Sequence, residues 1–411
     1  MKTQASEWTT SPLGQVANLV MGQSPESKFY SEEEAGLAFL QGCAEFQARF
    51  PKHAVYCRQI KKIAPENSIL FSVRAPVGRI NIADQAYIIG RGLAAITGID
   101  VEQDYLEQYL HFEESNFRNV SQGSTFEAIN SSELSTWPIK HPTDKPEQSK
   151  IAEVLSKVDQ AIEQTESLIA KQQRIKTGLM QDLLTRGIDE HGNLRSEETH
   201  EFKDSPLGRI PVEWEVSNFR NITEVNQGLQ IAIEKRFKSE GPKRHKYITI
   251  QYLNNPEKNI EYIDTPPANL ICKQDDVLFT RTGNTGQIVT GIEGVYHNNF
   301  FKIAFDKNKI IHDFLITFLC WEPIQEQIKE LAGTTTIPDL NHGDFYALPL
   351  LLPDIVEQER LMGVLSKQIT FVNSEIGNLK KLRSLKTALM QDLLTGKVRV
   401  TPLMENMEVC S

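Results

Sequence analysis

The sequence predicts an α+β protein in which two mixed α/β domains are separated by a long antiparallel two-helix coiled coil. Two observations support this prediction. The chain contains an internal repeat with a pseudo-two-fold arrangement, and each copy closes with a long amphipathic segment. With 411 residues, the chain is also longer than a single hydrophobic core usually serves, so at least two domains are expected.

The repeat is clearest at the end of each copy. The segment KTGLMQDLLT at 176–185 recurs as KTALMQDLLT at 386–395, with nine identities in ten residues. Shorter matches lie upstream at the same offset of 210 residues, and they begin at Gly123, Glu147 and Val154 of the first copy. No insertion or deletion separates these matches, so the sequence indicates a duplication.

The earlier part of each copy repeats more loosely. SPLG at 11–14 matches the same four letters at 205–208, ILFS at 69–72 resembles VLFT at 277–280, and GRI at 78–80 resembles GQI at 286–288. Variable and similar segments therefore alternate along the chain. This order is typical of two modules that share a scaffold and differ in their contact surfaces.

The similar segments predict two long helices, because apolar residues recur with a spacing of four and three. Gly187 and Gly396 stand where a C-terminal cap is expected. About 40 helical residues would form a rod about 60 Å long. Such a seam needs a partner, and we expect the other copy to supply it in antiparallel orientation; the alternative is that each helix covers only its own domain. The predicted seam consists of Ile151, Leu155, Val158, Ile162, Ile169, Leu179, Leu183, Leu361, Leu365, Val372, Leu379, Leu382, Leu389 and Leu393.

The variable segments mix signals for strands and for helices. Residues 247–253 are rich in β-branched and aromatic side chains and meet a turn at 254–256, so a strand is predicted there. Residues 276–280 predict a buried strand, and residues 104–112 and 312–332 predict helices. Both variable segments are therefore interpreted as mixed α/β domains.

Composition limits the location and the class of the protein. No apolar run approaches the ~20 residues that a membrane-spanning helix needs, and no signal peptide is visible. The cysteines are far apart and odd in number, which predicts reduced thiols in a cytoplasm and argues against a zinc or disulfide site: Cys43, Cys57, Cys272, Cys320 and Cys410. The net charge of −10 counts against a uniformly basic DNA-binding protein, so any DNA contact must use a local basic face.

The repeated motifs resemble those of a known family, the specificity (S) subunits of type I restriction–modification systems. Glu147-Gln148 and Glu357-Gln358 stand at the start of the two long helices, and both copies end in the KTxLMQDLLT block. The loop at 279–286 and the run at 333–349 are similar to the target-recognition domains of that family. The resemblance covers nearly the whole chain, in the family's order.

The resemblance implies a domain order and a set of partners. The expected divisions are target-recognition domain 1 (1–137), conserved helical region 1 (138–190), a linker (191–204), target-recognition domain 2 (205–346), conserved helical region 2 (347–400) and a C-terminal tail (401–411). Each domain would read one half of a bipartite site in double-stranded DNA, and the helix pair would set the gap between the halves.

The resemblance also implies that the chain is not catalytic by itself. Two methyltransferase (M) subunits would dock on the helices and methylate adenine with S-adenosylmethionine. Restriction (R) subunits would add translocation and cleavage with ATP and Mg²⁺. No cofactor or metal is expected in this chain, and no membrane association is expected.

A basic run at 235–246 carries six positive charges in twelve residues, which suits contact with phosphates. The alternative is a solvated surface loop. The glycine-rich loop at 281–286 could approach a phosphate or place an amide on an adenine edge, and the alternative is a plain hairpin turn. The repeated Gly-Ser/Thr-Thr motif suits phosphate contact or a structural turn. The candidate DNA contacts are Arg74, Arg79, Ser124, Thr125, Lys235, Arg236, Lys238, Lys243, Arg244, Lys246, Arg281, Thr282, Asn284, Thr334 and Thr335.

Two other classes of protein fit the sequence less well. A fused methyltransferase or nuclease would need further motifs, but Asn255-Pro256-Glu257 does not match the Asn/Asp-Pro-Pro-aromatic motif of an adenine methyltransferase. The sequence has neither a phosphate-binding P-loop motif nor a histidine pair with metal-ligand spacing. A coiled-coil scaffold without a DNA role would explain the helices but not the two large α/β domains.

Overall fold

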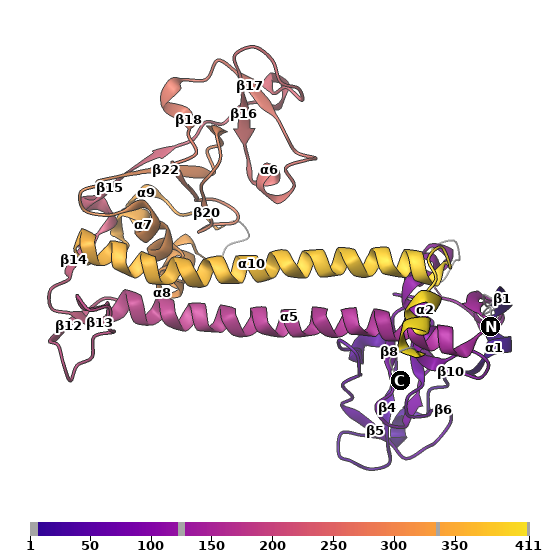
Figure 1. The fold of residues 1–411 in the computed structure, drawn as a ribbon. Coiled ribbons are helices and arrows are strands. Elements are labelled where there is room, and N and C mark those ends of the chain that lie inside the picture. Colours follow the sequence, from indigo (N-terminus) through magenta and orange to yellow (C-terminus); the bar gives the residue numbers. More distant parts are fainter. Residues whose placement is uncertain (1–6, 122–127, 334–337, 409–411) are drawn as a thin grey trace. The chain divides into compact units, whose positions relative to one another are not determined.

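The structure is a computed structural model that describes residues 7–121, 128–333 and 338–408. The chain divides into two compact units: unit 1 contains residues 1–167 and 376–411, and unit 2 contains residues 168–375. Both boundaries fall inside the long helices α5 (Lys145–Thr185) and α10 (Ile355–Leu394), so each unit holds part of both helices (Figure 1). Within the described ranges, no helix is long and apolar enough to cross a membrane.

Unit 1 is built on two β-sheets and one separate strand pair. The first sheet has the order β2 (Ala17–Met21), β10 (Leu93–Gly98), β7 (Ile69–Ser72) and β8 (Ile80–Ile82). The second has the order β3 (Tyr30–Ser31), β5 (Val55–Cys57), β4 (Leu37–Leu40), β9 (Tyr87–Ile89) and β6 (Ile63–Ala64). The separate pair joins β1 (Trp8–Pro12) to β11 (Pro138–Pro142).

The helices of unit 1 follow the same chain order. They are α1 (Leu13–Val16), α2 (Gln103–Phe112), α3 (Glu114–Ser121), α4 (Ser131–Ser135) and α11 (Thr401–Glu408), with the 3-10 helices η1 (Ser27–Phe29) and η2 (Cys43–Glu45).

Unit 2 contains corresponding sheets. The first has the order β15 (Thr223–Gln227), β22 (Phe300–Phe305), β19 (Val277–Thr280) and β20 (Ile288–Val289). The second has the order β17 (Tyr262–Asp264), β16 (Arg244–Ile248), β21 (Gly294–Tyr296) and β18 (Ile271–Cys272). Two further pairs are β14 (Glu215–Asn218) with β23 (Pro349–Leu352) and β12 (Phe202–Ser205) with β13 (Gly208–Pro211).

The helices of unit 2 lie between and beside these strands. They are α6 (Ile250–Asn254), α7 (His312–Leu319), α8 (Glu322–Ala332) and α9 (His342–Ala347), with the 3-10 helices η3 (Phe219–Asn221), η4 (Ile233–Lys235) and η5 (Ala268–Leu270).

The two units share one topology. The four-stranded sheets have the same strand order, and each second sheet contains one parallel pair, β4 with β9 in unit 1 and β16 with β21 in unit 2. The predicted α+β class and the predicted internal repeat are therefore confirmed. Unit 1 adds the edge strand β3, for which the second sheet of unit 2 has no counterpart among its described strands.

One sequence match is not a structural equivalence. SPLG at 11–14 runs from β1 into α1, whereas SPLG at 205–208 includes the turn of the β12–β13 hairpin. The counterpart of β1 is β14, because each pairs antiparallel with the strand that precedes a long helix. Trp8 therefore corresponds to Trp214. The match was misleading because proline and glycine recur in unrelated turns.

The hydrophobic cores explain why the units divide inside the helices. In unit 1, Ile151 and Leu155 of α5 pack in one core with Leu393 and Leu394 of α10. In unit 2, Leu183 and Leu184 at the end of α5 share a core with Leu361 at the start of α10. Each unit therefore buries the start of one long helix against the closing block of the other.

Within each unit, the two helix segments lie side by side and antiparallel (Figure 1). In unit 1, Lys386 Nζ lies 2.5 Å from Asp159 Oδ1, and Arg383 Nη2 lies 2.6 Å from Glu166 Oε1. The residue number falls on one helix as it rises on the other, which confirms the predicted antiparallel pairing. In unit 2, Gln368 Nε2 donates to Gln172 Oε1 at 2.9 Å. The residues of the predicted seam are all buried or half-buried.

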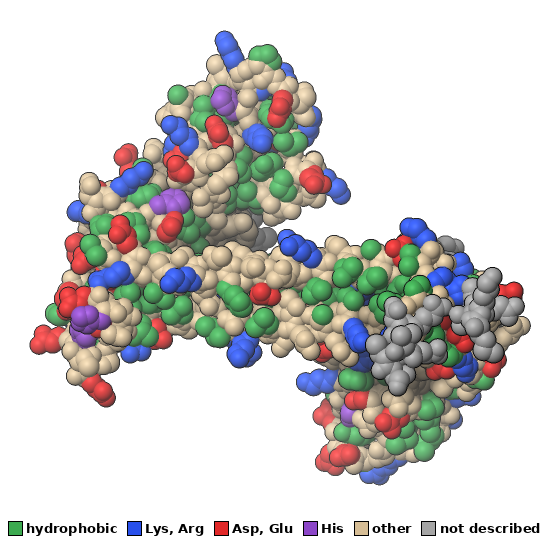
Figure 2. Space-filling view, viewed as in Figure 1, with side chains coloured by type: hydrophobic (Ala, Val, Ile, Leu, Met, Phe, Trp, Pro, Cys, Tyr) green, Lys and Arg blue, Asp and Glu red, His purple; other side chains and the backbone are tan. Residues whose placement is uncertain are grey.

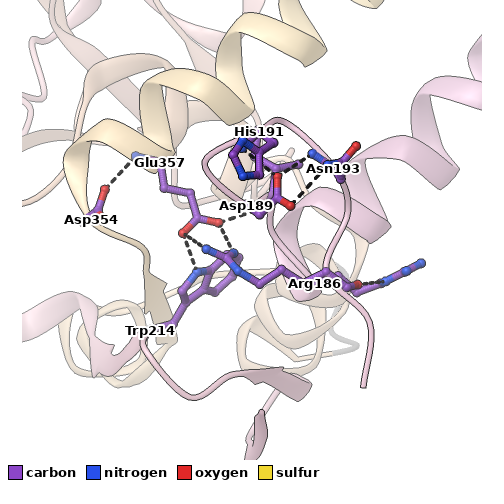
Figure 3. A network of polar contacts seen from close by, with 9 residues as sticks. Arg186, Asp189, His191, Asn193, Trp214, Asp354 and Glu357 are labelled. Atoms are coloured by element: carbon purple, nitrogen blue, oxygen red, sulfur yellow. Dashed lines mark hydrogen bonds and ion pairs between the residues drawn. The ribbon is translucent and has the colours of Figure 1, made fainter. Parts of the chain in front are cut away.

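A buried carboxylate fixes the start of α10 in unit 2 (Figure 3). Glu357 is 3% exposed and accepts hydrogen bonds from the Arg195 guanidinium, from Trp214 Nε1 at 3.1 Å and from the backbone N–H of Ile188 at 3.0 Å. Gly187 (φ +65°) leaves the space for this cluster, because a Cβ there would lie 2.3 Å from Glu357 Oε1. The end of α5 is thereby tied to the start of α10.

Unit 1 repeats this arrangement with a different arginine. Glu147, at the start of α5, accepts from Arg399 Nε and Nη2, both at 2.6 Å. Gly396 (φ +73°) lies against the ring of Trp8, as Gly187 lies against Trp214. Two equivalent glutamates therefore find arginine partners at positions that are not equivalent in the repeat.

The neighbouring glutamine anchors a helix of the globular region in each unit. Gln148 accepts from the backbone N–H of Glu102, directly before α2, at 2.8 Å and donates to Pro142 O at 2.7 Å. Gln358 accepts from the backbone N–H of Ile311, directly before α7, at 2.9 Å and donates to Pro353 O at 2.9 Å. The repeated Glu-Gln pair thus joins three elements in each unit.

One local expectation is corrected. The strand predicted at 247–253 ends at Ile248, and α6 follows, because the Thr249 hydroxyl accepts from Tyr252 N at 3.1 Å and caps a helical turn. The polar stretch interpreted as a linker also carries fixed contacts. Ile188 bridges Leu194, and Arg195 is buried against Glu357.

Candidate nucleic-acid interface

The β19–β20 loop of unit 2, residues 281–286, is a tight hairpin. Gly286 N donates to Thr280 O at 2.9 Å, and Gly286 has a φ of +96°, which favours glycine. In unit 1 the β7–β8 loop closes in the same way, with Gly78 N donating to Ser72 O at 3.0 Å. The predicted loops are therefore equivalent hairpins on a common backbone.

The polar side chains of the 281–286 loop have different tasks. Arg281 Nη2 pairs with Asp339 Oδ2 at 2.7 Å, Arg281 Nε donates to Leu340 O at 3.2 Å, and the guanidinium lies over the Phe301 ring. Thr282 also donates to Asp339. Arg281 and Thr282 therefore hold the loop in place. Asn284 is exposed at the loop tip, where its amide donates to Gln287 Oε1 at 2.9 Å.

The matching loop of unit 1 presents cations. Arg74 is exposed and Arg79 is half-buried. No ion pair is found for either guanidinium among the described residues. These two arginines are therefore better placed for phosphate contact than Arg281.

The structure separates the basic run of unit 2 into two groups. Arg236 and Lys238 both pair with Glu261, at 3.0 and 2.7 Å. Although burial raises the pKa of Glu261, hydrogen bonds from Lys238 and Arg236 bring it below its ordinary value. Arg244 pairs with Asp264 at 3.2 Å and stacks over Phe237. These three cations are neutralised by carboxylates of the same unit, so they do not form an open basic patch.

The other three cations of the run are exposed. Lys235, Lys243 and Lys246 have no acidic partner within the described part of the chain. Figure 2 shows blue and red side chains interspersed over the globular region of unit 2, which agrees with the partial neutralisation of its positive charges. Any phosphate contact from this run would therefore come mainly from these three exposed lysines.

Most of the two repeated Gly-Ser/Thr-Thr motifs lies outside the described residues. Ser124, Thr125, Thr334 and Thr335 lie outside the described residues. Gly333, with a φ of +79°, follows α8 directly.

The long helices also expose apolar side chains outside the seam. On α10, Val364 is 37% exposed and Phe371 is 41% exposed, one heptad apart; on α5, Ile175 is 45% exposed. Hydrophobic side chains are visible on the surface of the helices in Figure 2. These apolar side chains lie outside the predicted seam and are not covered by the other long helix.

Sequence reasoning missed two sets of residues. Arg195 and Arg399 hold the helix starts, but their unequal positions in the two copies concealed them. The loops that follow β2 and β15 were also overlooked. Their signal was Gly22 and Gly228, which occupy equivalent turns after equivalent strands.

The fold and these paired loops define a protein with two related DNA-recognition modules on a pair of helices. A family model described as the type I restriction modification DNA specificity domain matches residues 5–172 and 211–384. The chain therefore belongs to the specificity (S) subunits of type I restriction–modification systems, the non-catalytic members of those enzyme complexes. It is a DNA specificity subunit, which confirms the resemblance seen in the sequence.

Individual relatives agree with this assignment. A putative type I restriction enzyme MjaX specificity subunit of Methanocaldococcus jannaschii is 35% identical over 186 residues, 44% of this chain and 44% of that protein. The MjaVIII specificity subunit of the same organism is 24% identical over 346 residues, 78% of each chain. The matched part thus spans less than half the length of the first relative and about three quarters of the second.

Two solved structures share the fold. The S subunit of a type I system from M. genitalium has a TM-score of 0.59 at 16% identity and covers 96% of this chain and 97% of that one. A chain from a type I system studied for complex assembly and conformational transition has a TM-score of 0.59 at 14% identity, covering 96% and 99%.

Proposed function

We propose that the chain selects a bipartite target in double-stranded DNA, with each unit reading one half. The observation that carries this proposal is the pair of units, which share strand order and loop geometry but present different side chains. The hairpin loop of unit 1 carries Arg74 and Arg79, whereas that of unit 2 exposes Asn284. Arginine and asparagine prefer different bases in the major groove, so two such units would read two different half-sites.

The remaining candidate contacts serve as phosphate-binding groups in this proposal. Lys235, Lys243 and Lys246 of unit 2 would neutralise the backbone of the DNA. Arg236, Lys238, Arg244, Arg281 and Thr282 act mainly by holding the loops. Ser124, Thr125, Thr334 and Thr335 stay candidates for phosphate contact.

The same proposal assigns the exposed helix faces to partner subunits. Two methyltransferase subunits would pack on α5 and α10, and restriction subunits would join the assembly. These partners would bring S-adenosylmethionine, ATP and Mg²⁺; the described residues of this chain contain no cluster of metal-ligating side chains. The assembly would work in the cytoplasm, which suits the free thiols of Cys43, Cys57, Cys272 and Cys320.

Mapping of methylated adenines tests the proposed reading function. The chain is co-expressed with its methyltransferase subunit, and the methylated sites are sequenced. The expected result is one motif in two parts separated by a fixed spacer. Replacing residues 281–286 is expected to change one part only. The matched control is the double variant Glu190→Ala with His191→Ala, which alters an exposed turn and should leave the motif unchanged. A change in both parts on loop replacement would contradict the proposed division of labour.

Co-purification tests the docking face. Phe371→Asp is expected to reduce recovery of the methyltransferase subunit at least tenfold, because a buried contact would acquire an unpaired charge. Thr370→Asp is the control, since Thr370 is an exposed neighbour on the same helix. Equal recovery with both variants would show that this face of α10 is not the docking surface.

A further inference from the structure

Two loops cross at one end of the four-stranded sheet in each unit. In unit 1, Gly22 N donates to Leu93 O at 2.9 Å and Gln23 N donates to Ile89 O at 2.9 Å. In unit 2, Gly228 N donates to Phe300 O at 3.1 Å and Leu229 N donates to Tyr296 O at 3.0 Å. The loop after β2 thus crosses the β9–β10 loop just as the loop after β15 crosses the β21–β22 loop.

Backbone atoms fix both crossings. A Cβ at Gly22 would lie 2.1 Å from Gly90 O, and a Cβ at Gly228 would lie 2.2 Å from Tyr296 O. Real Cβ atoms do not approach carbonyl oxygens so closely, so glycine is required at both positions. Because the crossing depends on the backbone, the side chains beside it can change without loss of the fold.

Those side chains differ in chemistry between the units. In unit 1, the exposed Arg91 is placed by its backbone N–H, which donates to Ser24 Oγ at 3.2 Å, and Gln41 bonds the same hydroxyl at 3.1 Å. No ion pair is found for the Arg91 guanidinium among the residues that the structure describes.

Unit 2 has amides where unit 1 has the arginine. Asn298 Nδ2 donates to Gln230 Oε1 at 3.3 Å, and Gln227 Nε2 donates to Asn298 O at 3.1 Å. Asn298 Oδ1 is buried and has no hydrogen-bond partner within the described ranges. A buried acceptor without a partner costs free energy, and rotation of the half-buried Asn298 side chain toward a ligand that donates a hydrogen bond would remove that cost.

We propose that these crossings are base-reading sites, with Arg91 reading a guanine in one half of the target and Asn298 with Gln230 reading an adenine in the other. Arginine can donate two hydrogen bonds to O6 and N7 of guanine. Asparagine or glutamine can donate to N7 and accept from the N6 amino group of adenine. The assignment rests on the proposed reading function and names the residues that perform it.

Neighbouring contacts make the unit 2 loop rigid before DNA binds. Arg236 donates to Ile231 O from both Nε and Nη2, at 3.0 and 2.7 Å, and the Tyr247 hydroxyl donates to Leu229 O at 2.6 Å. Reading groups on an ordered loop lose little conformational entropy when they bind. Arg236 is thus a positioning residue for Gln230.

Each crossing also adjoins the hairpin loop described above. Arg281 N donates to Asn299 O at 2.7 Å in unit 2, and Val73 N donates to Gly92 O at 3.0 Å in unit 1. The exposed loop residues Asn284 and Arg74 therefore belong to the same loop cluster as the proposed reading groups.

The test is adenine-methylation mapping of the co-expressed complex. Arg91→Ala is expected to lower discrimination about ten- to hundredfold at one base pair of one half-site, and Asn298→Ala to do the same at one base pair of the other. Arg91→Gln is expected to shift the preference at its position from guanine toward adenine, a gain that misfolding cannot produce. The matched controls are Arg58→Ala and Asn254→Ala, which remove exposed side chains of the same types elsewhere in each unit.

The outcomes separate the two proposals. If wild-type protein directs methylation to no bipartite motif, the proposed function fails. If the motif is bipartite but Arg91→Ala and Asn298→Ala leave every position unchanged, only the base-reading assignment is overturned. A uniform loss of methylation at all sites, without relaxation at a single position, overturns it as well, because that result indicates a structural role.

Discussion

Helices α2 and α7 occupy equivalent places in the two units but present different side chains. Both begin at a backbone N–H held by a glutamine, Gln148 for α2 and Gln358 for α7. Beyond that shared anchor, the sequences diverge. Glu107 and Gln108 of α2 are 6% and 2% exposed, whereas the corresponding positions of α7 hold Ile316 and Thr317.

This difference shows which contacts the duplication has kept. The glutamine hydrogen bonds that join a globular region to a long helix are the same in both units. The chemistry of the packed faces differs, because each face only has to fill its own space. In unit 1 the two positions are polar: Arg49 pairs with Glu107 at 3.2 Å, and Gln108 donates to Asp159 at 3.0 Å.

Removing the buried carboxylates at the starts of the long helices should give the largest difference in stability between the two units. Glu357→Ala would leave Arg195 buried without its partner and remove the acceptor of Trp214 Nε1. We expect a loss of about 3–5 kcal/mol in unit 2, the usual cost of breaking a buried ion pair. Glu147→Ala should cost less in unit 1, because the Arg399 side chain is 27% exposed against 10% for Arg195.

Hydrogen exchange followed by mass spectrometry measures this difference, since it reports opening of each unit separately. The control is Glu359→Ala, which changes an exposed glutamate of the same helix. If Glu147→Ala proved as costly as Glu357→Ala, the difference in arginine burial would not govern the energetics.

The polar face of α2 predicts a pH dependence confined to unit 1. Burial lowers the pKa of His111 from 6.5 to about 4, with Lys386 and Arg49 also lowering it and Asp159 raising it. The unfolded chain therefore binds a proton that the folded chain does not. The contribution of His111 to the stability of unit 1 is fully present above about pH 6.5 and is lost as the pH drops toward 4, by about 3 kcal/mol.

Replacing the histidine isolates its share. His111→Gln should remove this part of the slope between pH 6.5 and 4, as measured by hydrogen exchange in unit 1. Glu107 contributes with the opposite sign, because burial raises its pKa, and it is unchanged in the variant. His191→Gln is the control, since that histidine is exposed. An identical slope for His111→Gln and wild type would disprove the role of His111.

The smallest expected difference in stability concerns the lysine that begins the repeated KTxLMQDLLT block in each unit. Lys386 pairs with Asp159 at 2.5 Å, whereas no ion pair is found for its counterpart Lys176 in the described part of unit 2. Lys386→Ala should destabilise unit 1 by about 0.5–1 kcal/mol, and Lys176→Ala should change unit 2 by less than about 0.5 kcal/mol. Denaturant titration of both variants at low and high salt checks this, because added salt should reduce only the first effect. The reverse order would contradict the comparison.

Patterns that depend on local periodicity could be predicted from sequence. The heptad spacing predicted both long helices and their antiparallel pairing, and the apolar run at 276–280 predicted the buried strand β19. Long-range partners could not be predicted. Arg195 and Arg399 occupy unequal positions in the repeat, and only the fold brings each to a glutamate.

The candidate site divides in the same way. The sequence located the hairpin loops at 74–79 and 281–286, because glycines mark tight turns. It could not show that Arg236, Arg244 and Arg281 pair with carboxylates, since Glu261, Asp264 and Asp339 come from other strands and loops. The number of positive charges in a stretch of sequence therefore overestimates how much unpaired positive charge the folded surface carries.

The discontinuous make-up of unit 1 bears on the order in which the protein folds during synthesis. Unit 2 is one continuous stretch, residues 168–375, so all of its core is present once that stretch has left the ribosome. Unit 1 needs Leu393, Leu394 and Val400 in its core, and these residues are translated after the whole of unit 2. Unit 2 can therefore complete its core before unit 1 does, although most of unit 1 is translated first. A chain truncated before residue 393 would leave the core of unit 1 incomplete.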